Sequence, residues 1–188
     1  NFKKILKAVK FFLIDKIKRK NIKNHKQELM INNCKMKILP NDEGISPELL
    51  IYGVHEPLTT DLIQTEVKPG MTILDIGSNI GYYAILESKL IGSTGKIFSI
   101  EPSPQNFKLL QENLEIQDTN NFQIFNLAIG NKNEKLEFLI SKKSNWSKIK
   151  QESDIIGEND TVITVPVKTL NLFCEDNNLE KINLIRMD

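Results

Sequence analysis

The feature that most constrains this chain is an alternation of strand-like and helix-like segments along its central part. Apolar strand patterns occur at Thr72–Ile76, Lys96–Ile100 and Phe122–Leu127, and they are separated by helical patterns at Tyr82–Leu90 and Gln105–Gln117. Strands that are connected through helices pair in parallel, because each connection has to cross back over the sheet. The sequence therefore predicts an α/β fold with an open, mostly parallel sheet.

A turn with two glycines follows the first strand pattern. Gly77 can adopt a positive φ and lets a ligand approach the backbone closely. Gly81 begins the next helix, whose free N–H groups favour a polar or anionic ligand group. Ligands in open α/β sheets bind beyond the carboxyl ends of the strands. We therefore expect one crevice to be faced by Asp75, Gly77, Asn79, Gly81 and, at the end of the second strand, Glu101.

The acid at the end of the second strand indicates a nucleoside ligand. The Glu101 carboxylate can accept hydrogen bonds from both hydroxyls of a ribose. The dinucleotide fingerprint G-x-G-x-x-G is absent, because the turn contains only Gly77 and Gly81. Asp75 would repel a pyrophosphate and attract the ammonium group of an amino-acid moiety. This pattern resembles the S-adenosylmethionine site of Rossmann-like methyltransferases.

Sequence blocks around the turn are similar to those of the FkbM family of methyltransferases. The similarity covers residues 44–188, with the blocks in order and at fitting distances. The glycine turn is generic to methyltransferases, whereas the Glu-Pro after the second strand, the Asn-x-Ala after the third and the final hydrophobic-Asp pair are more specific. The blocks are EPLT (56–59), VKPGMTILDIGSNIGYYAI (67–85), GKIFSIEPSPQNFKLLQENL (95–114), FNLAIGNKNEKLEF (125–138), VPVKTLN (165–171) and INLIRMD (182–188).

The resemblance implies a Rossmann-like class I fold, S-adenosylmethionine as cofactor, and methyl transfer, often to a hydroxyl oxygen of a sugar or another small metabolite. A small-molecule or glycan acceptor is therefore the expected partner. Two of the implied cofactor residues have an alternative role, since Asn126 would cap its strand and Tyr82 would pack in the core. The resemblance places Asp75, Gly77, Asn79, Gly81 and Tyr82 around the methionine portion, Glu101 on the ribose, and Asn126 and Ala128 beside the adenine.

No catalytic base follows from the sequence. The sulfonium methyl of the implied cofactor is already activated, so the protein mainly has to align the acceptor oxygen and help to remove its proton. His55 and Glu56 are candidates on the acceptor side. Asp188 is a third, because it matches the acid of the family's hydrophobic-Asp-Val-Glu-Gly block. The rest of that block is absent, so we expect the fold to be incomplete at the C-terminus and the native chain to continue beyond Asp188.

A polar stretch, Ser141–Asp160, lies between two strand-like runs at Lys135–Ile140 and Thr161–Val167. It is predicted to be a long hairpin loop, and such loops often carry binding residues. Trp146, the only tryptophan of the chain, lies in this loop. Two interpretations of this loop stay open: it could form a lid over the acceptor, or it could pack partially on the sheet.

The first 43 residues form a separate basic segment in front of the methyltransferase domain predicted at 44–188. Residues 1–26 contain ten Lys or Arg and one Asp, a net charge of +9, whereas the remainder has a net charge of −8. Apolar residues between Phe2 and Ile17 recur with helical spacing, which predicts an amphipathic helix. This helix would either pack on the domain or lie peripherally on an anionic membrane surface. A linker and a short hairpin at Leu29–Leu39 would follow.

The amino-acid composition argues against several other classes of protein. Cys34 and Cys174 do not have the spacing of a metal site or a disulfide framework, which favours a reducing cytoplasm and no metal. No run approaches the ~18 apolar residues of a membrane span. The acidic body disfavours nucleic acid as a partner. Two further functions stay open, a nicotinamide-dependent oxidoreductase and a non-catalytic nucleoside-binding or interaction module.

Overall fold

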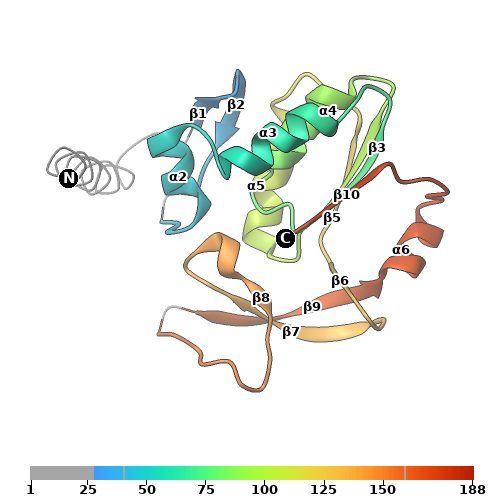
Figure 1. The fold of residues 1–188 in the computed structure, drawn as a ribbon. Helices are drawn as coiled ribbons and strands as arrows, with labels where there is room; N and C mark the ends of the chain where they lie inside the picture. Colours follow the sequence, from blue (N-terminus) through green and yellow to red (C-terminus); the bar gives the residue numbers. More distant parts are fainter. Residues whose placement is uncertain (1–27, 40, 159) are drawn as a thin grey trace, which may run out of the picture.

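The computed structural model describes residues 28–39, 41–158 and 160–188, and the predicted N-terminal amphipathic helix lies outside them. Its centre is a parallel four-stranded sheet in the order β10-β3-β4-β5 (Figure 1). The strands are β3 (Thr72–Ile76), β4 (Lys96–Ile100), β5 (Phe122–Phe125) and β10 (Leu184–Met187). β3 and β4 are apolar along most of their length because helices cover both faces of the sheet. The predicted α/β fold with a parallel sheet is confirmed.

One face of the parallel sheet is covered by four helices. Ile73 and Ile97 belong to the same buried cluster as Leu110 and Leu114 of the last of these helices. The β1–β2 hairpin that precedes residue 44 contributes to this cluster through Ile31 and Met36. The helices are α2 (Ile45–Tyr52), α3 (Pro57–Glu66), α4 (Tyr82–Ile91) and α5 (Pro104–Glu115), and the hairpin strands are β1 (Glu28–Ile31) and β2 (Cys34–Lys37).

The opposite face is covered by α6 (Leu170–Asp176). Leu74 and Phe98 alternate with the residues of the first face, as side chains in a strand must, and they pack with Phe173 of α6. α6 leads into β10, the fourth strand of the parallel sheet. β10 pairs in parallel with β3, with Arg186 opposite Asp75.

A second sheet lies beyond the ends of the parallel strands (Figure 1). Its order is β6-β9-β7-β8, and β7 pairs antiparallel with β9 along seven residues. The two strand-like runs around the polar loop therefore form the predicted hairpin. The strands are β6 (Ala128–Gly130), β7 (Glu134–Ile140), β8 (Lys148–Ile149) and β9 (Thr161–Thr169). The loop itself contains a short 3-10 helix, η2 (Ser144–Trp146), in front of β8.

Within these described ranges, no helix is both long enough and apolar enough to cross a membrane.

Candidate functional site

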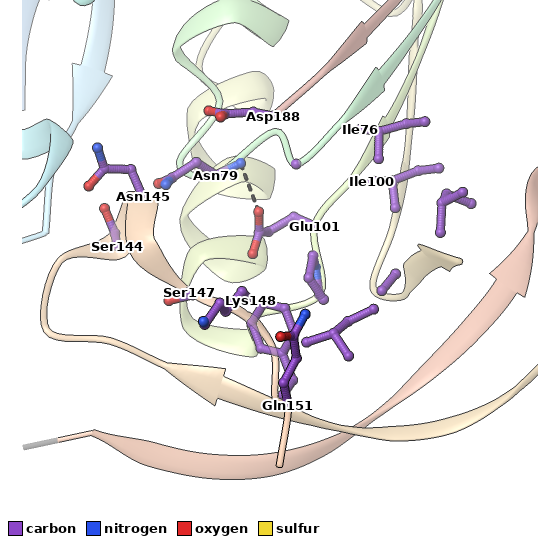
Figure 2. Close-up of a pocket in the computed structure, with 16 residues that line it drawn as sticks. Ile76, Asn79, Ile100, Glu101, Ser144, Asn145, Ser147, Lys148, Gln151 and Asp188 are labelled. Atoms are coloured by element: carbon purple, nitrogen blue, oxygen red, sulfur yellow. Dashed lines mark hydrogen bonds between the residues drawn. The ribbon is translucent and has the colours of Figure 1, made fainter. Parts of the chain in front are cut away.

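A cavity of about 420 Å³ lies between the carboxyl ends of the parallel strands and the second sheet. Gly77, Glu101 and Asp188 line it from the parallel strands, and Ala128 and Phe138 line it from the second sheet. Figure 2 shows Glu101 in the middle of this group, with Asn79 beside it. The volume is within the range of small-molecule sites in proteins. The cavity therefore occupies the place where an open α/β sheet binds its ligand.

The turn after β3 has the backbone conformation that its glycines permit. Gly77 has a φ of 80°, and its N–H donates to the carbonyl oxygen of Ile100 at 2.9 Å. A Cβ at this position would lie 3.0 Å from the carbonyl oxygen of Asp188. Asn79, with a φ of 52°, brings its N–H to within 2.8 Å of Glu101 Oε2 (Figure 2). The turn is therefore open towards the cavity and tied to the end of β4.

Glu101 is the central acidic group of the cavity. Its carboxylate is almost fully buried and accepts two backbone hydrogen bonds at 2.8 Å, from Asn79 to Oε2 and from Ser103 to Oε1. Burial raises the pKa of Glu101 to about 7, although both backbone donors act in the opposite direction. Each oxygen keeps a second lone pair after these bonds. The ionised carboxylate can therefore accept two further hydroxyl donors from a ligand.

Asp75 does not line the cavity, which corrects the expectation that it faces the crevice. Its side chain is fully buried on the face of β3 that α4 covers, and it forms an ion pair with Arg186 of β10. The Arg186 guanidinium stacks at 4.6 Å over the ring of Tyr83. The physical reason is strand alternation, because Asp75 shares a face with Ile73 and points away from the strand ends.

Glu87 of α4 adds a second carboxyl group beside this ion pair. It is fully buried, and among the described residues no hydrogen-bond donor reaches either oxygen. Burial, and then the charge of Asp75, raise the pKa of Glu87 well above its usual value, while Arg186 acts in the opposite direction. Sequence reasoning missed both Glu87 and Arg186. The parallel pairing of β10 with β3 was the signal that could have placed Arg186 opposite Asp75.

Three other predicted cofactor residues also lie away from the cavity lining. Gly81 begins α4 with a φ of 92°, and a Cβ there would lie 2.8 Å from Leu110, so this glycine allows α4 to approach α5. Tyr82 is buried, and its hydroxyl lies 3.1 Å from that of Thr60, which matches the core alternative. The Asn126 amide donates to the carbonyl oxygens of residues 101 and 102, which matches the capping alternative. Only Gly77, Asn79, Glu101 and Ala128 of the predicted set line the cavity.

Of the three candidates for a catalytic base, His55 and Glu56 are neighbours, with His55 Nε2 4.0 Å from Glu56 Oε1. His55 is buried, and its Nδ1 lies 2.6 Å from Glu48 Oε2. Glu56 accepts a hydrogen bond of 3.0 Å from the Tyr83 hydroxyl. Neither of these two residues lines the cavity, whereas Asp188 does. Asp188 follows β10, and its N–H donates to the carbonyl oxygen of Ile76 at 3.1 Å.

The polar loop forms one wall of the cavity, and sequence reasoning did not identify the residues that do so. They are Ser144, Asn145, Ser147, Lys148, Ile149 and Gln151. Trp146, which the sequence singled out, is not among the lining residues. It is 62% exposed, and the Lys143 Nζ lies 3.6 Å from its ring centroid. Loop composition indicated a binding role, but the choice of inward residues depends on the pairing of β8 with β7.

Among the described residues, no cluster of His, Cys, Asp and Glu side chains is suited to hold a metal ion.

Known proteins are similar to parts of this chain. A protein-L-isoaspartate O-methyltransferase of Methanococcoides burtonii is 42% identical over 50 residues, which are 27% of this chain and 25% of the relative. A probable cobalt-precorrin-6B C(15)-methyltransferase of Sulfolobus acidocaldarius is 27% identical over 86 residues, 46% of this chain and 45% of the relative. The chain therefore spans a quarter to less than half of the length of these two relatives.

The solved structures that match parts of this chain include methyltransferases of several kinds. Aeropyrum pernix fibrillarin, solved with natively bound S-adenosyl-L-methionine, has 27% sequence identity and a TM-score of 0.32, and the match covers 37% of this chain and 31% of fibrillarin. The model of the methyltransferase FkbM domain matches residues 75–188, which is more than half of the chain. This match includes the strand ends, the polar loop and Asp188. The chain belongs to the FkbM methyltransferase domain family.

Proposed function

We propose that this chain binds S-adenosylmethionine in the cavity at the strand ends and takes part in methyl transfer to a hydroxyl oxygen of a sugar or another small metabolite. The observation that carries the proposal is the Glu101 carboxylate. It is held by two backbone N–H groups and lines the cavity, and a carboxylate oxygen can accept more than one hydrogen bond. A buried carboxylate with that geometry suits the paired hydroxyls of a ribose.

The residues of the cavity fit the parts of this cofactor. Gly77 lines the cavity with backbone alone, and the methionine portion would lie beside this turn. Ala128, Ile129 and Phe138 supply an apolar surface for an adenine ring. When bound, the cofactor supplies a methyl group that is already activated on a sulfonium. The task that is left for the chain is to orient the acceptor and remove its proton.

The acceptor side of the proposal is supported by two groups. Asp188 lines the cavity next to the Gly77 turn and supplies a carboxylate that can take a proton from an acceptor hydroxyl. The wall from the polar loop adds hydroxyl, amide and ammonium groups, which suit a hydroxylated acceptor. The related proteins named above act on other acceptors by name, a protein isoaspartate and a cobalt-precorrin carbon. The hydroxyl acceptor is therefore the finer part of the proposal.

Calorimetry with S-adenosylhomocysteine and with NAD tests the cofactor. We expect binding of S-adenosylhomocysteine alone. Binding of NAD alone would support an oxidoreductase, and binding of neither would support an interaction module. Release of S-adenosylhomocysteine in the presence of candidate sugars, compared with isoaspartyl peptides, then tests the acceptor. Turnover with the peptides alone would overturn the hydroxyl acceptor but keep the methyltransferase.

A further inference from the structure

The cavity wall formed by residues 144–148, called here the η2 wall, is held in place without strand pairing to the parallel sheet. It follows β7 and leads into β8, and among the described strands no hydrogen-bonded pair joins the second sheet to the parallel one. Ser144 and Asn145 nevertheless face the same cavity as Glu101 (Figure 2). The position of this wall over the strand ends must therefore depend on contacts of another kind.

One buried carboxylate supplies such a contact. Asp42 is 8% exposed, and its Oδ1 accepts the Ser144 N–H at 2.8 Å. The same carboxylate accepts the N–H groups of Gly44 and Ser46, each at 2.8 Å, and so caps the start of α2. The bond from Ser144 joins two segments that are 102 residues apart in the sequence, and the other two bonds hold the carboxylate at the start of α2. An ionised carboxylate suits this role because it only accepts hydrogen bonds and has two oxygens for them.

The two segments also approach closely at a glycine. A Cβ on Gly44 would collide with Asn145 Oδ1 and lie 3.0 Å from the Ser144 nitrogen. Gly44 has a φ of −95° and a ψ of −111°, a combination outside the regions that residues with a Cβ favour, so glycine suits this position in backbone conformation as well as in space. Beside it, the Glu43 N–H donates to the Lys142 carbonyl oxygen at 3.2 Å. The junction therefore has a specific shape as well as a specific hydrogen bond.

We propose that Asp42 is a positioning residue that latches the η2 wall over the nucleoside cavity by accepting the Ser144 N–H. The ligand side of this inference rests on the proposed function, whereas the latch itself does not. Loss of the latch frees the wall, so a bound nucleoside has to order Ser144 and Asn145 again at a cost in affinity. Asp42 touches neither reacting atoms nor cofactor in this role and acts through the wall.

The fluorescence of Trp146 can be used to measure the mobility of the η2 wall. Trp146 is the only tryptophan of the chain and belongs to η2, so its fluorescence anisotropy reports the mobility of this wall. Two variants disturb the latch from opposite sides. Asp42→Asn leaves one acceptor oxygen and places an N–H donor against backbone donors, while Gly44→Ala pushes Asn145 away and keeps the carboxylate. The matched control is Asp176→Asn. Asp176 lies on α6, away from the cavity lining, and the substitution removes the acidic partner of Lys168.

The full chain and these variants are compared by Trp146 anisotropy and by calorimetry with S-adenosylhomocysteine. We expect Asp42→Asn and Gly44→Ala to lower the anisotropy without ligand and to weaken binding about tenfold, with Asp176→Asn unchanged. Wild-type anisotropy in a folded Asp42→Asn variant, judged by circular dichroism, would overturn the latch. If Asp42→Asn does not fold, Gly44→Ala decides in the same way. Absence of binding in the wild type would refute the proposed function, and the anisotropy would still decide on the latch.

Discussion

Asp75 and Arg186 lie opposite each other on adjacent parallel strands and form an ion pair that is buried under α4. Glu87 lies near this pair, and the Arg186 guanidinium therefore interacts with the carboxyl groups of Asp75 and Glu87 and also with that of Asp188. A buried ion pair is weak evidence for net stability, but removing one partner leaves an uncompensated charge. The main effect of the pair is therefore to fix the position of β10 beside β3, and its net contribution to the free energy of unfolding is small.

Replacing Arg186 by Met tests this arrangement. We expect the free energy of unfolding to fall by about 3–5 kcal/mol, because two buried carboxyl groups lose their cation. Urea unfolding followed by circular dichroism measures the loss. The double variant Asp75→Asn with Arg186→Met should lose clearly less than Arg186→Met alone, since one of the stranded charges is gone. An unchanged midpoint for Arg186→Met would show that the pair does not hold β10.

Glu87 should make stability depend on pH. Its pKa in the folded protein is raised above the usual value of 4.5, so between that value and the folded pKa the native state binds more protons than the unfolded one. Stability must then fall as the pH rises through this window. Glu87→Gln should remove part of that fall and increase stability at neutral pH, as measured by urea unfolding between pH 5 and 8. If the free energy of unfolding of Glu87→Gln depended on pH in the same way as that of the wild type, the raised pKa of Glu87 would be contradicted.

Glu101 should make nucleoside affinity depend on pH near neutrality. Its pKa is about 7 in the folded protein, and ribose hydroxyls can donate only to lone pairs that are not protonated. Affinity for S-adenosylhomocysteine should therefore fall roughly tenfold from pH 8 to pH 6, because the carboxylate has to release a proton before it binds. Calorimetry at several pH values measures this. Glu101→Gln should bind more weakly at pH 8 and show little dependence on pH, and a similar pH profile in both proteins would refute the role.

Gly77 is tested by a pair of matched variants. Gly77→Ala and Gly53→Ala both place a side chain at positive φ, with φ values of 80° and 70°. Only the Cβ at Gly77 meets the chain at 3.0 Å, at the Asp188 carbonyl oxygen, whereas the Cβ at Gly53 meets nothing within 4 Å. Both variants should lose about 1–2 kcal/mol of stability, but only Gly77→Ala should lose affinity for S-adenosylhomocysteine. Equal affinities would show that the turn does not shape the site.

The sequence predicted the parts of the site that depend on local order along the chain. Gly77 after β3 and Glu101 after β4 had to meet, because parallel strands end at one edge. Asp75 was placed wrongly, since its residue type outweighed its position on the helix-covered face. The η2 wall and Asp42 could not be predicted, because their meeting depends on how the second sheet folds back over the strand ends. No pattern in either segment indicates the other.

Asp188 is the cavity residue with the most direct consequence for the chemistry. Asp188 lines the cavity beside Gly77, and the proposed function assigns the proton of the acceptor hydroxyl to its carboxylate. Asp188→Asn keeps the size of the side chain but cannot accept that proton. We expect turnover, measured as S-adenosylhomocysteine release with the accepted sugar, to fall about 10²–10⁴-fold. Affinity for S-adenosylhomocysteine should stay near the wild-type value, because Glu101 and the Gly77 turn are untouched. His55→Gln serves as the control, since His55 is buried beside Glu48, away from the cavity lining, and a larger loss there than in Asp188→Asn would transfer the role of base to His55.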